Sequence, residues 1–142
     1  NYTNVRTFLG SLLIYFGFFL MCPLIVSLLM GDGAAGAFGV TLAVTFLTGF
    51  ALQGRGRVDD LSIQDAFAIV TIGWLAVSLL GAFPFVITGS VASYTDAFFE
   101  AVSGVTTTGA TVIPVPEEVP ESVLLWRSLL QWLGGMGFIV LS

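Results

Sequence analysis

The sequence contains no histidine and no lysine, and cysteine occurs once, as Cys22 inside an apolar run. Without histidine there are no imidazole metal sites and no Ser–His or Cys–His catalysis. A single cysteine also excludes an internal disulfide and a cysteine zinc cluster. These absences remove most enzyme classes, so we predict that the chain is not an enzyme and carries no cofactor of its own.

Charge is scarce as well, because 9% of the 142 residues are charged while 56% are hydrophobic and the mean hydropathy is +1.00. An average soluble domain is about a quarter charged. So few charges cannot cover the surface of a soluble fold of this size. The net charge of −5 also offers no basic patch for nucleic acid. The composition therefore predicts an integral membrane protein in a lipid bilayer.

The uncharged runs predict membrane-spanning helices. Residues 7–30 and 33–54 form two such runs, each long enough as a helix to cross the roughly 30 Å hydrocarbon core. A third covers 66–95, with a span ending near Thr88, and a fourth covers 128–142. The runs are continuous, without the alternation of barrel strands. We therefore expect an all-α integral membrane fold.

The arginines predict the orientation of these helices. Arg55 and Arg57 lie in a short loop, and short basic loops remain cytoplasmic. Arg6 agrees, since two crossings return the chain to the same side. The loop 89–122 is then expected outside. Arg127 is the exception to this cytoplasmic placement of arginines, because it falls near the outer end of the fourth span. We expect it either to pair with nearby glutamates or to lie at the membrane interface.

One segment is too short to span. Ser93 and Asp96 have the spacing of a capping box at the start of a helix, and Gly104 can end that helix. The helix expected over about 95–104 is roughly 13 Å long, less than half of the hydrocarbon thickness. The irregular polar stretch 106–111 follows it, and such backbone is tolerated at membrane depth only inside protein or beside water. The order span, half-helix, polar strand, span therefore predicts a re-entrant pore loop.

The electrostatics of this loop favour a cation. The carboxyl end of a helix carries about −0.5 of an elementary charge, and here it precedes the polar strand. Carbonyl oxygens in such a strand can replace the water shell of potassium, and Gly109 can adopt the backbone angles this requires. Asp96 and Glu100 are expected at the outer mouth, where acids concentrate cations; the alternative is a solvated helix face.

Two tryptophans, and a glycine cluster in the last run, have structural interpretations, although Trp126 itself precedes that run. Trp126 and Trp132 are typical of interfacial anchors. The cluster at 134–137 favours close helix packing over a hinge.

Two motifs together resemble a known family. They are DAFFEAVSGVTTTGAT at 96–111 and LWRSLLQWLGGMGFIVL at 125–141. They are similar to the bacterial Trk-type potassium uptake subunit of the Trk/Ktr/HKT superfamily. The resemblance implies a potassium-channel-like fold of four helix–pore loop–helix units around one pore. The leading transmembrane helix pair would then be 1–54, the cytoplasmic basic loop 55–65, and the first unit 66–142.

The same resemblance implies site residues and partners. The filter strand falls on Thr107, Thr108, Gly109 and Ala110, with Gly109 at the family's filter glycine, which is associated with preference for potassium over sodium. The expected location is the cell inner membrane. A homodimer and a cytosolic nucleotide-binding regulatory ring are implied as partners.

These expectations predict potassium uptake by selective permeation, with this chain supplying one of four filter strands. Because one strand cannot surround an ion, we expect either the amino-terminal part of a longer protein or an assembly of four copies. A secondary transporter with a discontinuous helix is the alternative, although there a helix amino terminus more often meets an anion. A non-conducting membrane assembly fragment is the third possibility.

Overall fold

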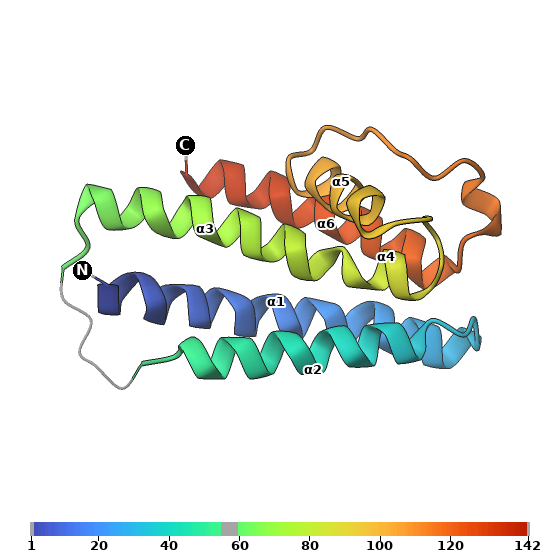
Figure 1. The fold of residues 1–142 in the computed structure, drawn as a ribbon, viewed down its shortest axis with the longest axis horizontal. Coiled ribbons are helices and arrows are strands. Elements are labelled where there is room, and N and C mark those ends of the chain that lie inside the picture. Colours follow the sequence, from blue (N-terminus) through green and yellow to red (C-terminus); the bar gives the residue numbers. More distant parts are fainter. Residues whose placement is uncertain (1, 55–59, 142) are drawn as a thin grey trace.

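The computed structural model describes residues 2–54 and 60–141, with side chains as far as residue 137. Arg55 and Arg57, in the first part of the expected basic loop, lie outside the described residues. All regular secondary structure in the described part is helical, which confirms the expected fold class (Figure 1). The elements are α1 (Tyr2–Met30), α2 (Ala35–Leu52), α3 (Ile63–Gly81), α4 (Phe83–Ile87), α5 (Tyr94–Val105), η1 (Pro116–Glu118) and α6 (Glu121–Leu141).

Helices α1 and α2 form an antiparallel pair along one side of the molecule (Figure 1). Gly31 and Gly33 take positive φ angles of 64° and 81°, which glycine adopts easily, and so turn the chain back on itself. The two helix backbones approach closely, since a Cβ atom on Gly10 would lie 2.8 Å from the carbonyl oxygen of Gly49. Small residues permit this kind of contact between apolar helices.

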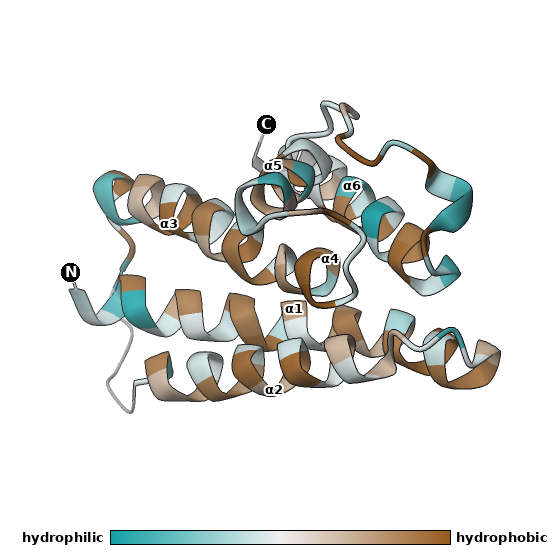
Figure 2. Ribbon diagram, turned by 45° about the vertical axis from the view of Figure 1, so that its right-hand side comes forward, coloured by the Kyte–Doolittle hydropathy of each residue, from teal (hydrophilic) through white to brown (hydrophobic). Residues whose placement is uncertain are grey.

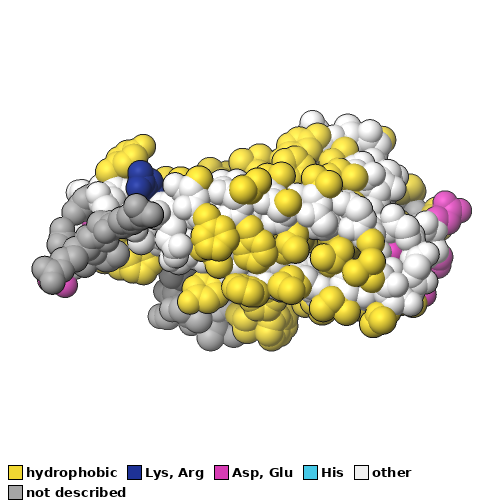
Figure 3. Space-filling view, turned by 90° about the horizontal axis from the view of Figure 1, so that it is seen from below, with side chains coloured by type: hydrophobic (Ala, Val, Ile, Leu, Met, Phe, Trp, Pro, Cys, Tyr) yellow, Lys and Arg dark blue, Asp and Glu magenta, His cyan; other side chains and the backbone are white. Residues whose placement is uncertain are grey.

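Three helical stretches are long and apolar enough to cross a membrane: Tyr2–Met30, Ala35–Leu52 and Ile63–Ile87. The third includes α3 and α4, which meet at Ala82 just before Pro84. Helix α6 is not among them, and its side chains are described only to residue 137. Hydrophobic residues predominate along α1 to α4, whereas hydrophilic residues gather near helix ends, at η1 and on parts of α5 and α6 (Figure 2). The face seen in Figure 3 is broadly hydrophobic, with charges near its ends, as expected for contact with lipid.

Trp126 of α6 lies at the centre of the core rather than at an interface. Its side chain is 0% exposed, and its Nε1 donates to the carbonyl oxygen of Gly81 at 3.0 Å. Its ring packs 5.4 Å from that of Phe16 and 6.3 Å from that of Phe38, between centroids. The prediction of an interfacial anchor is therefore wrong for Trp126, because its one polar atom finds a partner inside the protein and burial costs little.

Asp32, in the turn between α1 and α2, connects the leading helix pair to α6. Its Oδ2 accepts the backbone N–H of Ser122 at 3.1 Å, and its Oδ1 accepts the N–H of Ala34 at 3.0 Å and the hydroxyl of Ser27. Burial alone would raise the pKa of Asp32, but the hydrogen bonds outweigh it and lower the pKa from 3.8 to about 2. A carboxylate is well placed at the first turn of α6, where free N–H groups and the helix dipole favour negative charge.

Gly134 allows α6 to meet the carboxyl end of α5. A Cβ atom at this position would lie 1.8 Å from the carbonyl oxygen of Val105. Gly104 of α5 faces α6 in the same way, because its Cβ would lie 3.0 Å from the Cβ of Leu130. Close packing therefore explains the glycine at position 134. Gly137 differs, since no described atom lies within 4 Å of the place that its Cβ would take.

Substituting Gly134→Ala is expected to lower the free energy of unfolding by ~1–3 kcal/mol, because the added methyl group would overlap backbone atoms. Gly137→Ala is the matched control on the same helix and should be neutral or slightly stabilising, since alanine favours helices over glycine. Thermal unfolding of the two purified variants checks this. Equal melting temperatures for both would contradict the packing role of Gly134.

Substituting Asp32→Asn is expected to destabilise the protein by about 1 kcal/mol at neutral pH, the usual scale of a helix cap. The folded-state pKa is lowered, so the stabilisation is complete above the ordinary value of 3.8 and disappears as the pH falls towards about 2. The melting-temperature difference between wild type and variant should shrink accordingly between pH 5 and pH 2. Glu117→Gln, at an exposed position of η1, is the control. A difference that persists unchanged at low pH would contradict the charge-dependent cap.

Candidate cation-binding site

Helix α5 presents its carboxyl end to the polar strand. It has 12 residues and a length of roughly 18 Å, still well short of a full crossing. Ser93 Oγ accepts the N–H of Asp96 at 3.2 Å, so one half of the expected capping box is present. The helix continues through Gly104 to Val105, because Gly104 serves as a contact with α6 rather than as a stop.

After α5 the backbone turns its N–H groups back onto the helix end. Thr107 N donates to the carbonyl oxygen of Gly104 at 2.9 Å, while Thr108 N and Gly109 N donate to that of Ser103 at 2.9 and 3.3 Å. Two positive φ angles produce this turn, 57° at Thr107 and 77° at Gly109. A β-branched residue rarely adopts such an angle, and strain of this kind concentrates at functional sites.

This arrangement directs three successive carbonyl groups away from the helix. In a trans peptide the C=O points opposite to the N–H, and no described peptide bond is cis. The carbonyl oxygens of Thr106, Thr107 and Thr108 therefore point outward, and we call them the outward carbonyl row. No donor from residues 2–54 or 60–141 contacts them, and all three residues are exposed. Such a row can offer oxygen ligands to a cation from one side.

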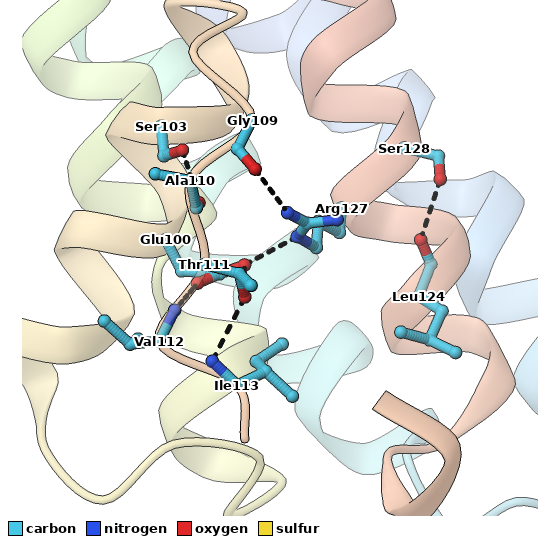
Figure 4. Close-up of polar contacts among 10 residues, drawn as sticks. All are labelled: Glu100, Ser103, Gly109, Ala110, Thr111, Val112, Ile113, Leu124, Arg127 and Ser128. Carbon is cyan, nitrogen blue, oxygen red and sulfur yellow. Dashed lines mark hydrogen bonds and ion pairs between the residues drawn. The ribbon is translucent and has the colours of Figure 1, made fainter. Parts of the chain in front are cut away.

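The next two carbonyl groups accept hydrogen bonds from side chains of the same chain. Arg127 Nη2 donates to the carbonyl oxygen of Gly109 at 3.3 Å, and Ser103 Oγ donates to that of Ala110 at 2.5 Å (Figure 4). The four predicted filter residues are thus contiguous on one exposed segment, but they divide into two pairs. Thr107 and Thr108 present free carbonyl oxygens, whereas Gly109 and Ala110 have theirs bound by side chains.

Glu100 differs most from its expected place. It is 1% exposed, and its Oε1 accepts Arg127 Nε at 2.6 Å. Its carboxylate also accepts the hydroxyl of Thr111 at 2.8 Å and the backbone N–H of Val112 at 2.9 Å (Figure 4). A buried carboxylate with a cationic partner cannot act as an open acid at a pore mouth or as a solvated face, so both expectations are wrong for Glu100. Asp96 is half-buried on the first turn of α5, and its mouth role stays a prediction.

Arg127 therefore takes the first of the two placements expected for it, a pair with a glutamate. The opposite charges were visible in the sequence, yet 27 residues separate them and five acids were available on the outer side. The contact of Ser103 with Ala110 had no sequence signal, because serine near a helix end is common. Among the described residues there is no group of three or more acidic, cysteine or histidine side chains that could hold a metal ion, so the oxygens that the strand offers to a cation are chiefly its backbone carbonyls.

Comparisons with known proteins agree with these features. A family model described as "TrkH: Cation transport protein" matches residues 36–142. The "Trk system potassium uptake protein TrkH" of Halomonas elongata is 44% identical over 94% of this chain, and that of Escherichia coli strain K12 is 37% identical over 100%. These alignments cover 28% and 30% of the two relatives, so the chain spans less than a third of their length.

A solved structure gives the same result for the fold. The crystal structure of the potassium transporter TrkH from Vibrio parahaemolyticus matches 99% of this chain with a TM-score of 0.92 and 39% identity. The match covers 31% of that chain. The helical architecture, the half-helix with its exposed strand and the family match together lead to one conclusion: the chain belongs to the TrkH family of cation transport proteins.

Proposed function

We propose that this chain forms one wall of a potassium-selective pore and takes part in potassium uptake across the cell inner membrane. The observation that carries the proposal is the outward carbonyl row of Thr106, Thr107 and Thr108 at the carboxyl end of a half-membrane helix. Carbonyl oxygens substitute for the hydration shell of potassium in filters of this kind. The relatives named as potassium uptake proteins support the same cation.

The site needs further strands to enclose an ion. The carbonyl row lies on one exposed side of the chain and approaches a cation from one direction only. The remaining ligands would come from further pore units of the same protein, which the length of the relatives favours, or from other copies of this chain. In either arrangement the ion passes without covalent chemistry, and the chain acts as a transporter rather than as an enzyme.

The electric field of α5 supports a cation at this place. Its carboxyl end carries a partial negative charge and directly precedes the row. The amino-terminal end would serve an anion poorly, because Ser93 already accepts the N–H of Asp96 and the Asp96 side chain adds negative charge there. This is the observation that favours a cation pore over the alternative of a transporter with an anion at a broken helix.

We also propose an orientation for the chain, a role for Asp96 and two kinds of partner. The pore loop would face outside and the 55–65 loop the cytoplasm, as the positions of the arginines favour. Asp96 would raise the local cation concentration at the mouth, an effect that salt screens. A homodimer and a cytosolic nucleotide-binding ring are the partners proposed from the family resemblance.

Substituting Gly109→Ser in the complete transporter is expected to reduce the ratio of potassium to sodium flux by roughly tenfold. The φ angle of 77° is costly for a residue with a Cβ atom, by about 1–2 kcal/mol, so the strand would leave its geometry. Gly89→Ser is the matched control, since Gly89 has a φ angle of 71° with no described atom within 4 Å of its Cβ position, and lies outside the strand. Fluxes of both ions into proteoliposomes provide the measurement. An unchanged ratio for Gly109→Ser, or an equal loss for Gly89→Ser, would contradict the filter assignment.

A further inference from the structure

Arg127 of α6 connects the polar strand to a buried acid of α5. Its Nη2 donates to the carbonyl oxygen of Gly109 at 3.3 Å, and its Nε donates to Glu100 Oε1 at 2.6 Å. The Glu100 side chain is completely buried, whereas that of Arg127 is 25% exposed. In Figure 4 the guanidinium lies between the two partners and reaches both from one side chain. Its planar fork of donors suits such a double contact, which a single ammonium group cannot reproduce.

Glu100 holds the strand beyond Gly109. Its Oε1 accepts the hydroxyl of Thr111 at 2.8 Å, and its Oε2 accepts the N–H of Val112 at 2.9 Å. The carboxylate therefore fixes the strand two and three residues after the carbonyl that Arg127 binds. One ion pair thus restrains the strand at three places, immediately after the outward carbonyl row ends.

The charges of the pair balance beside the proposed cation path. A guanidinium is always protonated, so Arg127 places a permanent positive charge on the strand. Alone it would repel a potassium ion at the row, because charges interact strongly where water is scarce. Glu100 at 2.6 Å compensates for this charge, and the strand is held without a net charge of either sign.

We propose that Glu100 and Arg127 are positioning residues for the cation site: they withdraw the Gly109 carbonyl from the ion, leave the row at Thr106–Thr108 as the ligands of this chain, and keep the site electrically neutral. The inference rests on the proposed function, because it specifies which oxygens of the same site meet the cation. Gly109 then contributes its backbone angle rather than its oxygen.

Arg127→Lys in the complete transporter tests how the strand is positioned without changing the charge at residue 127. Lysine keeps the positive charge beside Glu100 but cannot reach Gly109 and Glu100 through separate nitrogens of one plane. The ratio of potassium to sodium flux is expected to fall about tenfold, the scale of one charge-assisted hydrogen bond, while the apparent KM for potassium stays near its wild-type value. Arg6→Lys, at an exposed position of α1, is the control and should change neither quantity.

Glu100→Gln tests the charge balance. The amide has nearly the same shape but leaves Arg127 uncompensated, so the apparent KM for potassium should rise at least severalfold. In the double variant Glu100→Gln/Arg127→Gln the net charge is again zero, so KM should return towards the wild-type value while the flux ratio remains low. Glu117→Gln is the control for removing an exposed acid on η1. A purely structural pair would lower the amount of folded protein and the maximal flux in all variants, with flux ratio and KM unchanged.

The outcomes distinguish this inference from the proposed function. If the wild-type protein does not favour potassium over sodium, or Gly109→Ser leaves the ratio unchanged, the proposed function fails. Suppose instead that the wild type is selective and Gly109→Ser loses this selectivity. If Arg127→Lys and Glu100→Gln then alter neither the flux ratio nor the KM, the positioning role is overturned while the proposed function stands. If a single variant fails to fold, the double variant provides the test, because it buries no unpaired charge. A lowered ratio of potassium to sodium flux in the double variant supports the positioning role, and a wild-type ratio overturns it.

Discussion

The carbonyl oxygens of an irregular strand can stay free for an ion only if its N–H groups find acceptors elsewhere, because irregular backbone has no hydrogen bonds of its own and lipid offers none. In this chain the carboxyl end of α5 meets that requirement. Its last carbonyl groups accept the N–H groups of Thr107, Thr108 and Gly109, and this single arrangement turns the carbonyl groups of Thr106, Thr107 and Thr108 outward. The left-handed angle of Thr107, unfavourable in isolation, is a consequence of the same hydrogen bonds.

The remainder of the molecule keeps α5 and the strand in place. Trp126 joins α6 to α3 and to the leading helix pair through Gly81, Phe16 and Phe38. Asp32 fixes the start of α6 from the α1–α2 turn. Gly134 then allows α6 to touch the final carbonyl of α5. The leading pair is thus packed against the helix that positions the strand, which gives it a structural connection to the site.

Sequence reasoning could reach the helices and the half-helix because both depend on local composition: apolar runs, their lengths and a polar strand that breaks them. It could not reach the contacts that depend on distant partners. Glu100 looks like an exposed acid of an amphipathic helix, and only the position of Arg127, 27 residues away, makes it a buried ion pair. Asp32 and Ser122 are 90 residues apart, and nothing in either segment indicates their contact. The division of the filter residues into free and bound carbonyl groups likewise follows from the donors of Arg127 and Ser103, which spacing does not specify.

The central claim is that the carbonyl groups of Thr106, Thr107 and Thr108, and not that of Gly109, meet the cation in this part of the pore. Crystals of the complete transporter soaked in thallium or rubidium, heavier substitutes for potassium, would locate the ion directly by anomalous diffraction. We expect ion peaks within ligand distance of oxygens in the outward row, with Arg127 still bound to the Gly109 carbonyl. An ion coordinated by Gly109, with Arg127 turned away, would contradict the claim.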